Sequence, residues 1–293
     1  MQKLIIEARI NEYMSRDDGN ERVPYTPAEI AADALACREA GASIVHFHAR
    51  KPDGAPEHDS AVYADTVRLI RKTTDLLVHP TLGFVTLDAS AEERLAHIVR
   101  MAADPEGAPH FAPMDTGSVN VDRYDPERRR FESRDLIYKN STGTLLHFAE
   151  GIRAVGLKPC LVSWGIGFTR FASSLLDMGL VDKPAYMLVL LTDGSCIAGH
   201  PGTPEGLRAH LDFLPANGAV EWSVANYGGN LLPLAETIIS RGGHIAIGIG
   251  DHTYVEQGYP SNAQLIGEVV KIARKLGRDI ATPEEVRSIL DMN

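Results

Sequence analysis

The sequence lacks paired cysteines and long apolar runs. Its three cysteines, Cys37, Cys160 and Cys196, are far apart and form no CxxC motif, so they support neither a disulfide framework nor a thiolate metal site. No apolar stretch approaches the roughly 18 residues that a membrane-spanning helix needs, and the opening MQKLIIEARI does not resemble a secretion signal. We therefore expect a protein of the reducing cytoplasm, neither secreted nor membrane-bound.

The sequence also has no extended basic block. Lys and Arg number 29 against 39 Asp and Glu, which gives a net charge of −10, and the longest basic run is Arg128 to Arg130. This balance argues against nucleic acid as the main partner. With 44% hydrophobic residues among 293, the chain has enough apolar surface to bury a large core, so we expect a soluble globular protein.

Short β-rich runs alternate with amphipathic segments along the whole chain. Three of these segments open with the capping pattern of a helix start, at Thr26, Ser90 and Thr282. The expected strands cover residues 3–10, 43–49, 75–81, 109–115, 158–164, 185–191, 220–225 and 243–250. Eight such units without a linker predict a single (β/α)₈ TIM barrel over residues 1–293, with a doubly wound open sheet as the alternative.

The first expected strand favours the barrel. In LIIEARIN, Glu7, Arg9 and Asn11 alternate with apolar residues. A barrel strand can turn such a polar set inward, where Glu7 and Arg9 could pair, whereas a sheet covered by helices on both faces would leave the charges unsatisfied. The charged, apolar-poor stretch around 116–140 follows the fourth strand, and we expect it to be a surface excursion or a lid beside the site.

In a TIM barrel the active site lies at the carboxyl ends of the strands. Polar residues and glycines collect at these ends: Asn11, Glu12, His46, His48, Arg50, His79, Thr81, Asp115, Gly228, Gly229, Asp251 and His252. Asp251 follows the small-residue sequence IGIG, which leaves room for a ligand. Glycines after strands seven and eight are also typical of backbone phosphate sites, although glycine-rich turns are common for steric reasons alone.

His46 and His48 are the strongest candidates for a metal site. Side chains at i and i+2 of a strand share one face, and neutral imidazole is a good ligand for zinc and similar ions. Two histidines need only one carboxylate to form an open catalytic site. Spacing alone leaves this interpretation and a purely hydrogen-bonded pair equally open. His79 shares a face with Thr81, and a lone strand histidine is more often a supporting residue than a ligand.

The arrangement resembles the β-keto acid cleavage enzyme family. The resemblance runs through TPAEIAADALACREAGASIVHFHAR followed by DG, then LLVHPTLG, GGHIAIGIGDHTY and SNAQLIGEVVKIARKLGRDIATPEEVRSIL. It implies a TIM barrel that binds Zn²⁺, or another divalent metal, through His46 and His48, and that assembles as a homotetramer. The implied reaction joins a β-keto acid and acetyl-CoA to give acetoacetate and a new acyl-CoA. Asp251 matches the family's catalytic base, and Thr81 matches a hydroxyl of its substrate site.

The chain departs from the family pattern at three strand ends. Gly250 stands where the family has a metal-binding Glu, the pair Gly228 and Gly229 stands where it has Gly-Arg, and residues 160–162 lack the carboxylates of a Glu-x-Glu. Because strand one lies between strands eight and two in a closed barrel, we predict that Glu7 completes the metal shell, with Glu12 or His79 as alternatives. The substrate preference should therefore differ from that of the family's named representative.

The remaining predicted roles concern substrate and catalysis. We expect Glu12 to act in catalysis beside Asp251 and Thr81, and the substrate to contact Arg50, Asn11, Asp115, Gly228 and Gly229. Two other functions stay open. One is metal-dependent hydrolysis of the amidohydrolase type, although Trp164 and Asp193 stand where those barrels place histidines. The other is a catalytically degenerate barrel that binds an acyl-CoA or a keto acid.

Overall fold

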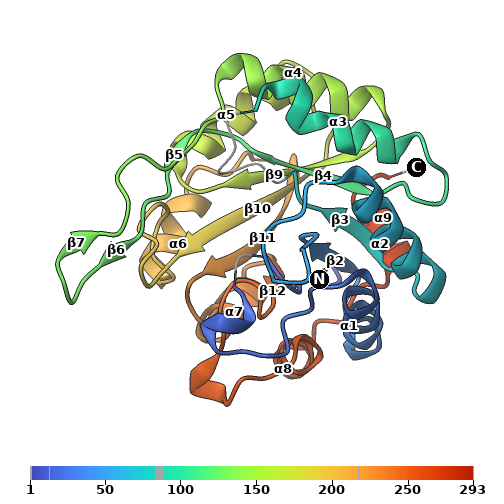
Figure 1. Cartoon of the computed structure of the whole chain (residues 1–293). Helices are drawn as coiled ribbons and strands as arrows, with labels where there is room; N and C mark the ends of the chain where they lie inside the picture. The colour runs from blue at the N-terminus through green and yellow to red at the C-terminus, as the bar shows by residue number, and fades with distance from the viewer. Residues whose placement is uncertain (1, 13, 83–88, 217, 293) are drawn as a thin grey trace.

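Eight parallel strands form a barrel surrounded by helices (Figure 1). The computed structural model describes residues 2–12, 14–82, 89–216 and 218–292. The barrel strands are β1 Ile6–Arg9, β2 Ile44–Phe47, β3 Leu77–Pro80, β4 Phe111–Asp115, β9 Lys158–Ser163, β10 Ala185–Thr192, β11 Val220–Tyr227 and β12 His244–Ile247. Each lies at a predicted position, with β11 running two residues further than expected. The predicted TIM barrel is confirmed.

The strands follow the order β3-β2-β1-β12-β11-β10-β9-β4, so the two ends of the sheet meet between β3 and β4. At this seam the His110 N–H donates to the carbonyl oxygen of Val78 at 2.8 Å, and the Val78 N–H donates to His110 Nδ1 at 2.9 Å. These two bonds nearly close the barrel. As expected, β1 lies between β12 and β2.

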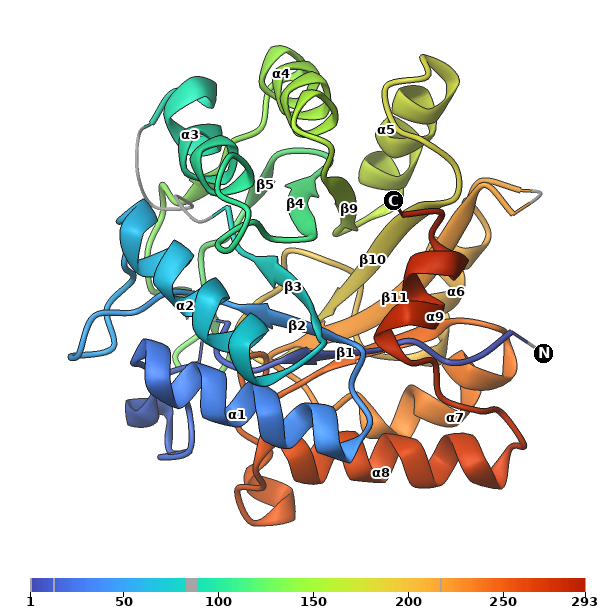
Figure 2. The same ribbon diagram turned by 90° about the vertical axis from the view of Figure 1, so that its right-hand side faces the viewer.

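The helices surround the sheet (Figure 2). They are α1 Pro27–Ala40, α2 Ser60–Thr73, α3 Ala91–Ala102, α4 Thr142–Ala154, α5 Ile166–Asp177, α6 Pro204–Leu211, α7 Leu232–Ser240, α8 Asn262–Lys275 and α9 Pro283–Ile289, with short 3₁₀ turns at Arg16–Asp18 and Val255–Gln257. The capping boxes predicted at Thr26, Ser90 and Thr282 are all present. Among the described residues, no helix is both long and apolar enough to cross a membrane.

Two apolar clusters form the core. One fills the space between the strands and the outer helices, and the other fills the barrel from its amino-terminal end, where Val286 and Leu290 near α9 pack with Ile5 and Phe111. The polar side chains of β1 are enclosed as predicted, because Glu7 is 0% and Arg9 3% exposed. The barrel interior is therefore apolar at one end and charged toward the other.

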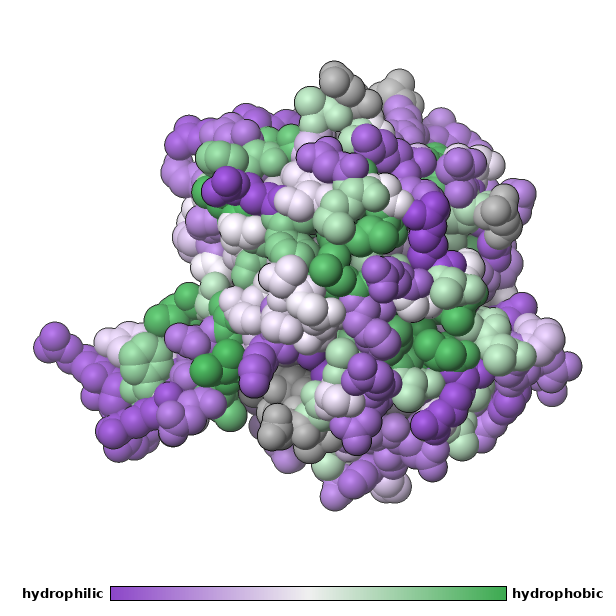
Figure 3. Space-filling view, turned by 90° about the horizontal axis from the view of Figure 1, so that it is seen from above, coloured by the Kyte–Doolittle hydropathy of each residue, from purple (hydrophilic) through white to green (hydrophobic). Residues whose placement is uncertain are grey.

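The stretch after β4 forms an arm made of two antiparallel pairs. Near the barrel β5 Val119–Asn120 pairs with β8 Ile137–Tyr138, and further out β6 Tyr124–Asp125 pairs with β7 Arg130–Phe131. The arm stands away from the body, hydrophilic at its tip and more hydrophobic where it joins (Figure 3). At its base the Tyr138 hydroxyl donates to Asp115, so the excursion reaches the strand ends.

Candidate active site

A pocket of about 80 Å³ lies at the carboxyl ends of the strands. Its described lining consists of Arg9, Glu12, His46, His48, His79, Thr81, Leu82, Pro113, Asp115, Tyr138, Val162, Trp164, Leu188 and Leu190. A larger cavity, of about 250 Å³, lies between His110, Lys158 and Met292, and its lining includes none of the predicted site residues. The smaller pocket is therefore the candidate active site.

The side chains of His46, His48 and Glu12 converge in this pocket. The two Nε2 atoms are 3.2 Å apart, and the Glu12 carboxylate lies 3.3 Å from Nε2 of His46 and 3.6 Å from Nε2 of His48. Zinc–nitrogen bonds of about 2.0–2.1 Å in a tetrahedral shell place neighbouring donors about 3.3 Å apart. Burial also lowers the pKa of both imidazoles, which favours the neutral form that binds metals. The three residues fit a divalent metal.

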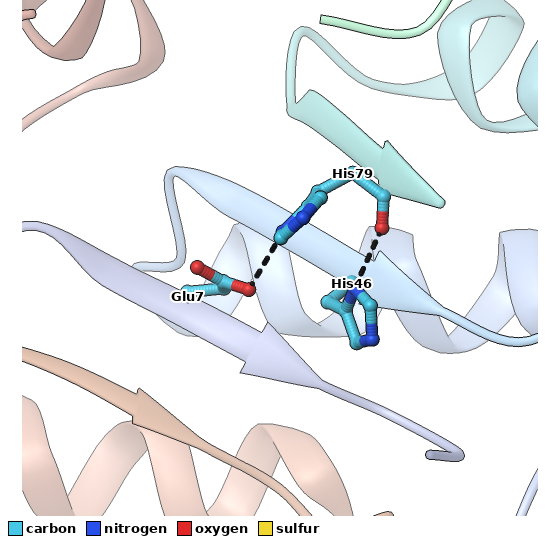
Figure 4. Close-up of side chains that lie close together, drawn as sticks. All are labelled: Glu7, His46 and His79. Carbon is cyan, nitrogen blue, oxygen red and sulfur yellow. Dashed lines mark hydrogen bonds and ion pairs between the residues drawn. The ribbon is translucent and has the colours of Figure 1, made fainter. Parts of the chain in front are cut away.

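The orientation of His46 is set by its neighbour on β3. His46 Nδ1 donates to the carbonyl oxygen of His79 at 2.8 Å (Figure 4). This leaves the lone pair of Nε2 directed at His48 and Glu12. A hydrogen bond from the remote ring nitrogen is the usual way in which proteins fix the tautomer of a metal-binding histidine. The facing Nε2 of His48 either donates to this lone pair or, in its other tautomer, presents a second lone pair that a shared cation would stabilise.

Two glycines in the loop after β12 allow the turn that carries Glu12 to lie at this position. A β-carbon at Gly250 would overlap the backbone nitrogen of Glu12 and lie 2.7 Å from that of Asn11, and one at Gly248 would overlap the carbonyl oxygen of Arg9. The backbone that follows β1 therefore occupies the space that a side chain at position 250 would need. The close packing of this backbone against the loop after β12 therefore places Glu12 in the site and also requires a glycine at position 250.

Asn11 and Arg50 hold the turn that carries Glu12. The Asn11 amide donates to the carbonyl oxygens of Pro24 and His48 and accepts from the His48 N–H at 2.9 Å. The Arg50 guanidinium donates to the carbonyl oxygens of Asn11, Glu12 and Met14 at 3.0, 3.0 and 2.9 Å. Neither residue lines the pocket. Both were predicted to bind substrate, and their contacts lie instead with the loop backbone.

Glu7 and His79 form a buried pair deeper in the barrel. His79 Nδ1 donates to Glu7 Oε1 at 3.0 Å, and the Tyr186 hydroxyl donates to Oε2 at 2.9 Å (Figure 4). Burial alone would raise the pKa of Glu7, but its interactions with His79 and Arg9 outweigh burial and lower that pKa to about 2. Glu7, His46 and His79 also lie close enough to form a second candidate metal group. Both oxygens of Glu7 are, however, already engaged.

Arg9 connects the acidic residues of the site. Its Nε donates to Asp251 Oδ2 at 2.8 Å, Nη2 contacts the Glu12 carboxylate, and Nη1 lies 3.7 Å from Glu7. Asp251 is 2% exposed and lies outside the pocket lining, and its Oδ1 has no hydrogen-bond partner among the described residues. Burial raises the pKa of Asp251 to about 6, although Arg9 opposes this shift.

The other predicted residues fall into two groups. Thr81 and Asp115 line the pocket, and Asp115 accepts hydrogen bonds from Trp164 Nε1 at 2.5 Å and from the Tyr138 hydroxyl at 3.0 Å. Gly228 and Gly229 do not line it. The Gly228 N–H donates to the carbonyl oxygen of Asp251 at 2.9 Å, and a β-carbon at Gly229 would overlap Asp193. A side chain at position 229 would therefore require Asp193 and Asn226 to move.

Among the polar and aromatic residues of the described lining, sequence reasoning missed Arg9, Trp164 and Tyr138, and it named none of the aliphatic ones. Arg9 was interpreted only as an interior partner of Glu7, whereas it also contacts Glu12 and Asp251. Trp164 directly follows β9, so the rule that sites lie at strand ends could have found it. Tyr138 lies in the arm, where no periodic signal marks a pocket residue.

The fold and the site define a TIM barrel with a candidate two-histidine, one-carboxylate metal centre at the carboxyl ends of its strands. The family model for beta-keto acid cleavage enzymes matches residues 3–292, and the chain belongs to this family.

Individual relatives agree with this assignment. The chain is 31% identical to the 3-keto-5-aminohexanoate cleavage enzyme of Fusobacterium nucleatum, over 100% of this chain and 99% of that one. It is 28% identical to the 3-dehydrocarnitine:acetyl-CoA trimethylamine transferase of Rhizobium meliloti, over 93% and 91% of the two chains. The ternary complex of ObcA with a C4-CoA adduct and oxalate shares the fold, with a TM-score of 0.71 and 15% identity over 92% of this chain and 68% of that one.

The packing around Gly250 can be tested with Gly250→Ala. The added β-carbon would displace the turn that carries Glu12, and overpacking of this kind typically costs about 1–3 kcal/mol. We expect a lower melting temperature together with weaker zinc binding. The matched control is Gly267→Ala in α8, where a β-carbon would meet nothing within 4 Å and should leave both properties intact. Equal behaviour of the two variants would contradict the close approach.

Proposed function

We propose that this protein transfers the acetyl group of acetyl-CoA to a β-keto acid, releasing acetoacetate and a new acyl-CoA, with zinc or another divalent metal at His46, His48 and Glu12. The observation that carries the proposal is the convergence of these three side chains beside Arg9. Membership of the β-keto acid cleavage enzyme family supports the reaction type. The name of the Rhizobium relative supports acetyl-CoA as the co-substrate.

In this reaction the bond between C2 and C3 of the keto acid breaks, as does the thioester bond of acetyl-CoA. The acetyl carbonyl carbon becomes bonded to C2 and gives acetoacetate, and the remaining acyl group becomes bonded to the CoA sulfur. The hard step is removal of a C2 proton, because the product is a carbanion. A bound divalent cation would act as a Lewis acid toward the oxygens that gain charge in this step. After the C2–C3 bond has broken, the proton returns to C2 and gives acetoacetate.

Glu12 is a better third ligand than Glu7 or His79. Its carboxylate contacts Arg9 and lies within 3.6 Å of both imidazole Nε2 atoms, whereas the candidate group that contains Glu7 includes His46 and His79 but not His48. His79 supports the site through its carbonyl oxygen, which holds the His46 ring. We therefore assign His46, His48 and Glu12 to the metal and treat Glu7 and His79 as their buried support.

Asp251 is the proposed base that takes the C2 proton. A pKa near 6 suits a general base at neutral pH, and Oδ1 is the oxygen left without a partner among the described residues. Arg9 orients the carboxylate through Oδ2, which is the task that the missing arginine after β11 would otherwise perform. Because Asp251 lies behind Arg9, substrate must reach it at the Arg9 side of the pocket.

The remaining residues either contact the substrate or hold other site residues in position. Thr81 and Asp115 contact substrate, since both line the pocket. Asn11 and Arg50 act on substrate only by holding the turn of Glu12, and Gly228 acts by fixing the backbone of Asp251. The homotetramer that the resemblance implies remains part of the proposal.

Removal of single carboxylates tests the metal assignment. We expect Glu12→Gln to weaken zinc binding by at least about 10 to 100-fold, because it removes a charged ligand, while Glu7→Gln keeps most of the bound metal. Metal content measured by mass spectrometry after dialysis against a chelator checks this. The control is Glu268→Gln, which removes an exposed carboxylate on α8 and should leave metal binding unchanged. Retention by Glu12→Gln combined with loss by Glu7→Gln would assign the ligand to Glu7 instead.

The same protein tests the reaction. Incubated with acetyl-CoA and β-keto acids, it should form acetoacetate and new acyl-CoA, and His46→Ala should abolish both products. Hydrolysis of a substrate without CoA would favour the amidohydrolase type of reaction. Tight binding of acyl-CoA without turnover would favour a degenerate barrel.

The pH dependence tests the base. Asp251 must be ionised to accept a proton, so kcat/KM should rise with pH through about 6 and fall below it. Arg9→Lys keeps a positive charge but loses the planar contacts to Asp251 and Glu12, so this rise should move to higher pH. Zinc content measured at each pH separates titration of the base from loss of metal. An unchanged profile in Arg9→Lys would argue against the pairing.

A further inference from the structure

The pocket has two unlike halves. Strands β1, β2 and β3 and the segments that follow them contribute the more polar half, which consists of Arg9, Glu12, His46, His48, His79, Thr81 and the apolar Leu82. Strands β4, β9 and β10 contribute the other half, in which Pro113, Val162, Leu188 and Leu190 are apolar. The keto and carboxylate groups of a β-keto acid belong at the polar half. Whatever is attached to the keto carbon must then lie against the apolar half.

The apolar half is a continuous wall. Val162 pairs in register with Leu188 on β10 and with Asp115 on β4, so the three side chains stand side by side. Leu190 follows Leu188 on the same face of its strand, as the period of two requires. These leucines are 1% and 4% exposed, and Val162 is 6% exposed. The wall therefore offers hydrocarbon contacts and little access to water.

Asp115 is the charged residue of this half among the described lining residues, and each of its oxygens already accepts one hydrogen bond from a neighbouring ring. Trp164 Nε1 donates to Oδ1 at 2.5 Å and the Tyr138 hydroxyl donates to Oδ2 at 3.0 Å. Both donors belong to rings that line the same pocket. Asp115 thus fixes the positions of the Trp164 and Tyr138 rings in the pocket wall through these two hydrogen bonds.

We infer that the substrates are short β-keto acids whose substituent on the keto carbon is an uncharged aliphatic group. This inference rests on the proposed function. The pocket volume of about 80 Å³ holds roughly five to eight non-hydrogen atoms, which is close to the eight of a five-carbon keto acid and the nine of a six-carbon one. A tail with a charge would be buried against Leu188 and Val162 without a free partner, which is strongly unfavourable.

A substrate panel tests the inference. The protein, loaded with zinc and supplied with acetyl-CoA, is given straight-chain keto acids of five and six carbons, the cationic 3-keto-5-aminohexanoate and 3-dehydrocarnitine, and a keto acid whose tail ends in a carboxylate. We expect kcat/KM for the uncharged tails to exceed that for every charged tail by at least about 10-fold. Preference for a cationic tail would overturn the inference and make Asp115 a counter-ion, while the proposed reaction would stand. Absence of new acyl-CoA with every compound would instead defeat the proposed function.

Two leucines on β10 provide a matched pair of variants. Leu190 faces the pocket, and its neighbour Leu191 is equally buried but faces the outer helices. Leu190→Ala should raise the ratio of kcat/KM for a longer tail over a shorter one by about 10-fold, because it opens space at the wall. Leu191→Ala should leave that ratio unchanged while costing similar stability.

A milder variant protects the test against loss of folding. Val162→Ala removes less volume from the same wall and should change the ratio in the same direction. Circular dichroism and gel filtration establish that each variant is folded. An equal shift in Leu191→Ala, or no shift in both folded wall variants, would overturn the inference.

Discussion

The buried guanidinium of Arg9 is the interaction on which the site depends. It meets Asp251, Glu12 and Glu7 inside the barrel, and buried charges are tolerated only when they are compensated. Three ionised carboxylates around one guanidinium leave two negative charges, which is the charge that a divalent cation on the neutral imidazoles of His46 and His48 would balance. The electrostatics of the cluster and the geometry of the candidate ligands therefore support the same conclusion.

That cluster exists because β1 runs unusually close to the loop after β12. Gly248 and Gly250 leave no β-carbon in the way, and the turn after β1 fills the space where a side chain from the loop would otherwise stand. Asn11 and Arg50 then fix this turn to the backbone. The resemblance implies a carboxylate after β12 and an arginine after β11. In this proposal β1 and its turn supply both groups, as Arg9 and Glu12.

The periodicity of the sequence predicted the regular secondary structure but not the conformation of the turns and loops. The eight strands, the capped helices and the inward polar face of β1 follow from alternation and capping rules, and all were found. The approach of the Glu12 carboxylate to both imidazoles could not be predicted, because Glu12 lies in a turn after the strand, where alternation no longer sets direction. Tyr138 reaches the pocket through the arm, and Gly228 and Gly229 turn away from it for steric reasons that only the packed loop reveals.

The two halves of the pocket differ in how strongly each side chain depends on its neighbours. On the half made by β1, β2 and β3, each polar side chain depends on others, because Arg9, Glu12, Glu7 and the histidines share hydrogen bonds and charge. On the half made by β4, β9 and β10, the residues mainly occupy volume, and a change of one apolar side chain leaves the charge balance intact. A single substitution on the second half can therefore alter the shape of the wall alone, whereas a substitution on the first half disturbs several hydrogen-bonded and charged partners at once.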